Sequence, residues 1–216
     1  MANRRAIVKR RKSVRNIRKI TRTMQLIATA RFQAAMNRAV ASRPYTDKLS
    51  EMVADLSRGL EDFRHPLMER HDEGREERAA VVVLTSNRGL CGGYNAQVLR
   101  KSIEHLDGLH ERGVGTDVHM VGRKGISAFR FRGRDVERKI TDIEDKPRFD
   151  EIEPLAQGLI DQFLEGEIGS AWAVYMRFYS AGKQAPEAVK LLPLEPLERT
   201  EEVEAQAASG IRPQYE

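Results

Sequence analysis

Cysteine is almost absent from this chain of 216 residues, which contains only Cys91. One cysteine cannot form an internal disulfide or supply a cysteine-based zinc site. His105 and His110 are five residues apart, whereas the HExxH zinc motif places its histidines four apart. No apolar run approaches the roughly 18 residues that a membrane-spanning helix needs. We therefore expect no metal, no cofactor and no direct insertion into a membrane.

Acidic residues are missing from positions 1–46, which carry 13 lysines and arginines. The whole chain carries +5, but the remaining 24 basic and 32 acidic residues give positions 47–216 a balance of −8. An asymmetry of this size indicates an acidic partner for the first segment. Nucleic acid, an anionic membrane surface and an acid-lined protein cavity all fit, and a solvated helix face is the plain alternative.

The basic segment also has the periodicity of a long helix from about residue 4 to residue 60, or ~85 Å at 1.5 Å per residue. Pro44 should permit at most a kink or a break. A long helix with a narrow apolar stripe normally pairs in a coiled coil. The chain offers no second helix of this length, so the partner is another chain or a missing part of this one. The stripe, at 3-4-3 spacing, consists of Ile17, Ile20, Met24 and Ile27.

The rest of the chain alternates strand-like and helical segments. Such alternation implies a mainly parallel sheet with right-handed crossovers, and hence a Rossmann-like α/β domain. We expect strands at 79–84, 116–122, 134–140, 170–180 and 187–194, and helices at 94–113, 123–133 and 148–168. The predicted organisation is a long basic helix (1–62), a charged linker (63–78), the α/β domain (79–194) and an acidic linker (195–216).

A glycine-rich turn, TSNRGLCGGYN (85–95), follows the first strand. It lacks the Gly-Lys-Ser/Thr of a P-loop and the GxGxxG spacing of a dinucleotide site. Glycines at this density more often mark a tight turn with close backbone packing than a phosphate cradle. No base to activate Cys91 can be identified, so we expect it to be a small buried hydrophobe. The sequence offers no convincing active site, and we do not expect an enzyme.

Several segments together form a recognisable set. KRRKSVRNIRKITRTMQLIATARFQAAMNRAVASRPY (9–45) combines a basic start, an IxxITxxM core and a small-residue stretch. TSNRGLCGGYN (85–95), VGRKG (121–125), FYSAGKQAP (178–186) and LLPL (191–194) follow in order. In this combination the chain resembles the gamma subunit, the central rotor shaft, of F-type ATP synthases. The resemblance spans essentially the whole chain, with Asn87 where that family usually has Asp.

The resemblance implies a mechanical function without bond chemistry. In that family the shaft couples rotation of the membrane c-ring to conformational changes in the catalytic beta subunits, which drives ATP synthesis. The implied partners are the alpha and beta subunits, the epsilon subunit and the c-ring. The implied location is the cytoplasmic side of a bacterial inner membrane. Family members continue into a second long helix, so the resemblance also implies a C-terminal helix beyond residue 216.

The resemblance assigns roles to four groups of residues. The stripe of Ile17, Ile20, Met24 and Ile27 would pack on the second helix. The residues that would face the catalytic head are Arg4, Arg5, Lys9, Arg10, Arg11 and Lys12. The family's motif turn is formed by Arg88, Gly89, Leu90, Cys91, Gly92 and Gly93. The foot of the rotor, near the c-ring, would include Arg38, Arg43, Tyr45 and Tyr215.

A rival hypothesis is an α/β protein whose basic helical arm binds nucleic acid. Thirteen positive groups could neutralise phosphates with a steep salt dependence. The apolar stripe argues against it, because such an arm would carry polar base-reading side chains. Stacking on single strands would also require aromatic residues among the basic ones, and none precedes Phe32. We therefore expect no nucleic-acid partner.

Overall fold

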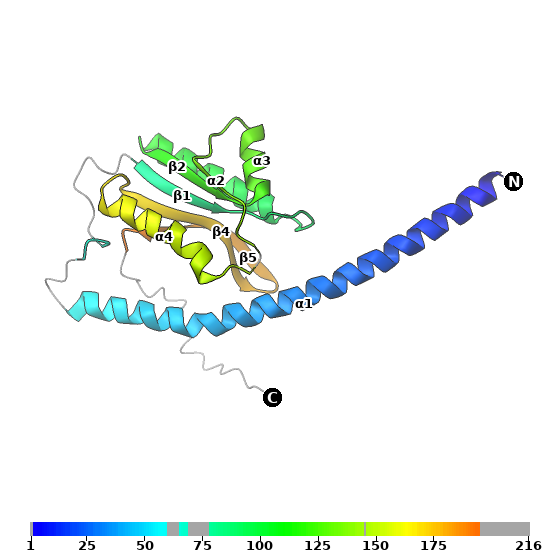
Figure 1. Cartoon of the computed structure of the whole chain (residues 1–216), viewed down its shortest axis with the longest axis horizontal. Helices are drawn as coiled ribbons and strands as arrows, with labels where there is room; N and C mark the ends of the chain where they lie inside the picture. The colour runs from blue at the N-terminus through cyan, green and yellow to red at the C-terminus, as the bar shows by residue number, and fades with distance from the viewer. Residues whose placement is uncertain (1, 60–64, 69–77, 145, 195–216) are drawn as a thin grey trace. The chain divides into compact units, whose positions relative to one another are not determined.

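The chain divides into two units in the computed structural model, which describes residues 2–59, 65–68, 78–144 and 146–194 (Figure 1). The described part of the first unit is the helix α1, Ala2–Gly59. The second unit, residues 62–195, contains the sheet and its covering helices.

The helix α1 is 58 residues long, which corresponds to ~87 Å. It continues through Pro44 without a break, within the expectation of at most a kink or a break there. An interior proline removes one backbone hydrogen bond of the helix. Between Arg4 and Ala41 every described side chain is exposed except that of Met36. The apolar stripe is therefore uncovered.

Five strands form one sheet in the order β3-β2-β1-β4-β5. Neighbours among β3, β2, β1 and β4 run parallel, and β5 runs antiparallel to β4. The strands are β1 (Arg78–Leu84), β2 (Gly115–Val121), β3 (Arg138–Ile140), β4 (Ser170–Ser180) and β5 (Lys183–Leu192). The helices of this unit are α2 (Tyr94–Glu111), α3 (Arg123–Phe131) and α4 (Phe149–Leu164).

The sheet is covered on both faces (Figure 1). The side chains of β1 alternate between two buried clusters, because successive residues of a strand point to opposite faces. Val81 and Val83 pack with residues of α2 and α3, whereas Ala80 and Val82 pack with residues of α4. This is why AAVVVL has no polar residue, as a strand buried on both faces requires.

The predicted fold class, a long helix followed by a mainly parallel α/β domain, is confirmed. Individual bounds differ by a few residues. The strand predicted at 187–194 begins earlier, at Lys183, because it pairs with β4 as a hairpin. The helix predicted to reach residue 168 ends at Leu164, just before Gly166, whose φ of +75° an L-residue rarely adopts.

The domain boundaries stay predictions. Most of the expected linkers, 63–78 and 195–216, lie outside the described residues. No helix in the described part of the chain is long and apolar enough to cross a membrane.

Candidate functional site

The glycine-rich motif turn connects the carboxyl end of β1 to the start of α2. The chain runs from β1 to β2 and β3 on one side, and then returns to β4 on the other side of β1. Open α/β sheets commonly bind ligands at the carboxyl ends of strands where the order reverses in this way. The motif turn therefore lies where such a fold would hold a ligand.

Side chains within the turn form hydrogen bonds with polar groups of its backbone. The backbone N–H of Ser86 donates to Asn95 Oδ1 at 3.0 Å, and the Ser86 hydroxyl donates to the Arg88 carbonyl at 2.6 Å. The Tyr94 hydroxyl donates to the Leu84 carbonyl at 3.0 Å, and burial raises the pKa of Tyr94, which keeps this donor protonated. This self-contained network favours a tight structural turn over a phosphate cradle.

Two motifs that are separate in the sequence meet at Thr85. Its hydroxyl donates to the Val121 carbonyl at 2.7 Å and accepts from the Gly125 N–H at 3.0 Å. Gly122 has a φ of +97°, and a Cβ on either glycine would lie closer than 3.0 Å to atoms of Thr85. Only glycine fits at both positions, which is the physical reason for the VGRKG spacing.

Asn87 joins three segments of backbone. Its Nδ2 donates to the carbonyls of Thr141 and Ile143 at 3.2 and 2.9 Å, and its Oδ1 accepts from the Arg123 N–H at 3.1 Å. An aspartate, the usual residue of the resembled family, could accept from Arg123 but could not donate to the two carbonyls. The asparagine thus ties the turn to the segment after β3 in a way that aspartate cannot.

The expectation that Cys91 is a small buried hydrophobe is wrong, because this residue is exposed. Its Sγ accepts a hydrogen bond from Asn95 Nδ2 at 3.0 Å. The residues on either side of it, Leu90 and Gly92, have positive φ values of +64° and +58°. Leu90 is 91% exposed, so the turn presents an aliphatic side chain and a thiol to the surface, together with Arg88, Gly89, Gly92 and Gly93.

The other predicted residues, apart from Tyr215, belong to α1 in the other unit. The basic side chains at its start are exposed, and so is the apolar stripe. Arg38 and Tyr45 are exposed further along the helix. The side chain of Arg43 and the whole of Tyr215 lie outside the described residues.

Sequence reasoning missed a polar cluster toward the amino ends of β1 and β2, away from the motif turn. It is centred on Arg78, Asp117 and His119. One signal was available, since His119 is a polar residue between two apolar ones in a strand. Within the described residues, no group of three or more His, Cys, Asp or Glu could hold a metal ion.

Comparison with known proteins decides the family. The family model described as ATP synthase matches residues 3–216. The ATP synthase gamma chain of Rhodopirellula baltica is 41% identical over 216 residues, which cover all of this chain and 72% of that protein. The gamma chain of Leptospira biflexa is 36% identical over 216 residues, which cover 73% of its length. The chain belongs to the ATP synthase gamma-chain family.

A solved structure agrees with this fold. The central stalk and c-ring structure of the Tetrahymena thermophila mitochondrial ATP synthase contains a chain with a TM-score of 0.60 and 20% identity. The match covers 88% of this chain and 84% of that one.

Gamma chains are non-catalytic rotor-shaft subunits of ATP synthase, and the catalytic sites lie in the beta subunits. The motif turn is thus not an active site. As a gamma chain, this protein works with other ATP synthase subunits in a membrane-bound complex.

Proposed function

We propose that this gamma chain couples rotation of the c-ring to conformational cycling of the catalytic beta subunits, and so supports ATP synthesis. Its partners are the alpha and beta subunits of the head, the epsilon subunit and the c-ring. The relatives named above come from bacteria, so we assign it to the cytoplasmic side of the inner membrane. Physically, the angle of the rotor changes which beta conformation has the lowest free energy.

The uncovered stripe of α1 carries this proposal. Ile17, Ile20, Met24 and Ile27 are 44–60% exposed, although they follow the spacing of a coiled-coil seam. Such a helix is stabilised mainly by packing against a partner helix. We assign these four residues to packing on a second helix of the shaft.

The basic start of α1 supports contact with the head. Its six cations are exposed, and no acidic residue lies in the first turn of the helix. Long-range attraction between charges tolerates a change of partner, whereas a fixed ion pair would resist rotation. We therefore propose that Arg4, Arg5, Lys9, Arg10, Arg11 and Lys12 face acidic loops of the head. Arg38, Arg43, Tyr45 and Tyr215 belong to the foot in this proposal.

Charge reversal in the assembled ATP synthase tests the coupling role. Lys9→Glu with Lys12→Glu should lower ATP synthesis several-fold at a fixed proton gradient, measured in inverted membrane vesicles with equal amounts of complex. The matched control is Arg100→Glu with Lys139→Glu, which makes the same charge change at exposed positions of the α/β unit. Unchanged synthesis in the helix variant, or an equal loss in the control, would contradict the proposed contact.

Affinity purification tests the partners directly. A tag inserted between Glu73 and Arg75 should recover the alpha, beta, epsilon and c subunits from detergent-solubilised membranes, identified by mass spectrometry. Recovery of nucleic acid without those subunits would instead support the basic helix as a phosphate-binding arm.

A further inference from the structure

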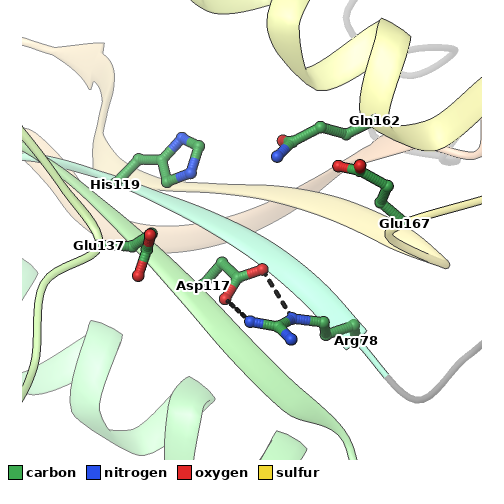
Figure 2. Close-up of a pocket in the computed structure, with 6 residues that line it drawn as sticks. All are labelled: Arg78, Asp117, His119, Glu137, Gln162 and Glu167. Atoms are coloured by element: carbon green, nitrogen blue, oxygen red, sulfur yellow. Dashed lines mark hydrogen bonds and ion pairs between the residues drawn. The ribbon is translucent and has the colours of Figure 1, made fainter. Parts of the chain in front are cut away.

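A second polar site lies toward the amino ends of the strands, away from the motif turn at their carboxyl ends. Figure 2 shows the residues that line it. It is a cavity of about 380 Å³ on the face of the sheet that α4 covers. Its walls come from the start of β1, from β2, from the residue before β3, from the end of α4 and from the loop that follows. They are Arg78, Asp117, His119, Glu137, Gln162 and Glu167.

The cavity has an excess of negative charge. Arg78 and Asp117 form a bidentate pair, with Nε and Nη2 of the arginine at 2.9 and 2.7 Å from the two carboxylate oxygens. This pair is neutral as a unit, so the lining carboxylates of Glu137 and Glu167 contribute −2, of which the nearby charge of Arg138 offsets one. Asp117 first, and then Glu137 and Glu167, raise the pKa of Arg78. All three carboxylates therefore contribute negative potential at the Arg78 guanidinium.

His119 is the buried polar group of the site. It is only 6% exposed, and its Nδ1 is buried without a hydrogen-bond partner among the described residues. Burial first, and then the charge of Arg138, lowers the pKa of His119, so the imidazole is neutral near pH 7. A neutral imidazole has one N–H donor and one acceptor nitrogen. In Figure 2 the ring lies across the cavity from the side-chain amide of Gln162.

The chemistry of the walls selects the kind of ligand. A bare metal ion needs several ligands that converge at about 2.0–2.6 Å, and the described residues contain no such group. A polyatomic cation instead spreads its charge and its N–H donors in several directions, as separated acceptors require. The cavity volume lies in the range that small-molecule sites occupy, about 300–1,000 Å³.

We propose that this cavity binds an organic cation whose ammonium or guanidinium group lies between Glu137 and Glu167 and is hydrogen-bonded by Gln162 and His119. The ligand is a free small molecule or a basic side chain of a neighbouring subunit, and the chemistry of recognition is the same in both cases. The argument for this site does not rest on the coupling role argued from α1, because all its residues belong to the α/β unit.

Binding is tested on the full chain with methylguanidinium as the probe. Histidine ring signals are followed by NMR, and His119→Gln identifies the signal of interest. Methylguanidinium chloride should shift this signal saturably, relative to sodium chloride at equal ionic strength. Glu137→Gln with Glu167→Gln should weaken the apparent affinity at least tenfold. The control, Glu144→Gln with Glu153→Gln, removes two exposed carboxylates of the same unit and should not.

Two NMR results would overturn the proposal. One is a linear shift of equal size in both double variants, which would mean non-specific cation binding only. The other is a saturable shift with magnesium chloride that displaces methylguanidinium, which would mean a metal site. Unchanged far-ultraviolet circular dichroism verifies that each variant is folded.

Carbodiimide labelling of Glu137 and Glu167, read by peptide mass spectrometry, separates the two sources in the assembled ATP synthase. Labelling that methylguanidinium suppresses indicates a site for a free cation. Labelling that is already suppressed without the probe, but returns in the isolated chain, indicates a basic side chain of another subunit. Full labelling at saturating methylguanidinium in both samples would contradict the proposal.

Discussion

Thr85 illustrates how single residues position the motif turn. It is 8% exposed, and its hydroxyl donates to the carbonyl of Val121 at the end of β2 and accepts from the N–H of Gly125 in α3. A buried hydroxyl in a well-satisfied network fixes the relative position of two strand ends. That arrangement leaves no room for a side chain at Gly122 or Gly125.

Gly125→Ala should therefore destabilise the α/β unit by about 1–3 kcal/mol, the usual effect of overpacking. Its Cβ would lie 2.6 Å from Thr85 Oγ1, at the start of α3. Gly108→Ala is the matched control, because a Cβ there meets no atom within 4 Å inside α2. That substitution should stabilise by about 0.5–1 kcal/mol through helix propensity. Urea unfolding measures both values, and the same sign for the two variants would refute the packing argument.

The buried imidazole of His119 makes folding pH-dependent. Its folded-state pKa is lowered, by burial first and then by Arg138, while Asp117 and Glu137 oppose the shift. Above about pH 6.5 both states are neutral, so its contribution is fully present. Below that pH the unfolded chain gains the proton first, and stability falls until the folded histidine is also protonated.

The prediction is a fall in the free energy of unfolding between pH 7 and pH 5, with a smaller slope in His119→Gln. Because one histidine binds at most one proton, the slopes of the unfolding free energy against pH should differ by at most about 1.4 kcal/mol per pH unit. His105, whose pKa burial also lowers, contributes in the same direction and remains in the variant. Chemical unfolding at several pH values provides the measurement, and identical slopes in the two proteins would contradict it.

At the scale of elements, apolar patterning was sufficient to predict a strand that is buried on both faces. The run at 79–84 predicts β1 because a strand buried on both faces needs apolar residues throughout. The start of β5 was not predictable in this way, since pairing of Lys183 with Ser180 defines it, and not a change in hydrophobicity. The 3-4-3 spacing of the stripe predicts α1 directly.

The candidate sites were only partly predictable. The motif turn was visible in the glycine spacing, but neither the exposure of Cys91 nor the positive φ of Leu90 follows from composition. The cavity proposed to bind a cation was not visible in the sequence, because its six residues come from several segments that only the folded sheet brings together.

The stripe of α1 yields a prediction at the scale of this element. Ile20→Asn should lower the amount of assembled ATP synthase, or its coupled synthesis, because it puts a polar amide into the coiled-coil seam. Ile20 is 60% exposed, so the stability of the isolated α/β unit should not change. Thr29→Asn, at an exposed position on the opposite side of α1, is the control. Equal assembly and synthesis in the two variants would contradict a packing role for the stripe.

At the scale of the whole molecule, the two units differ in what holds them together. Both buried clusters belong to the α/β unit, with members from Ala79 to Leu192. The described side chains of α1 are almost all exposed, so burial of these side chains contributes little to the stability of the helix. Without a packed partner helix, backbone hydrogen bonds and local propensity stabilise a helix only marginally.

The isolated chain should therefore unfold in two steps. Trp172, the single tryptophan, lies half-buried in β4 and reports only on the α/β unit. Circular dichroism at 222 nm is dominated by helix, to which the 58 residues of α1 contribute most. On heating, ellipticity should begin to fall below the temperature at which tryptophan fluorescence changes. If α1 packs on a partner helix as proposed, limited proteolysis within α1 should be slower in the assembled complex than in the isolated chain. Coincident transitions in the isolated chain would mean that α1 is stabilised by this chain alone, and the argument for a required partner helix would fail.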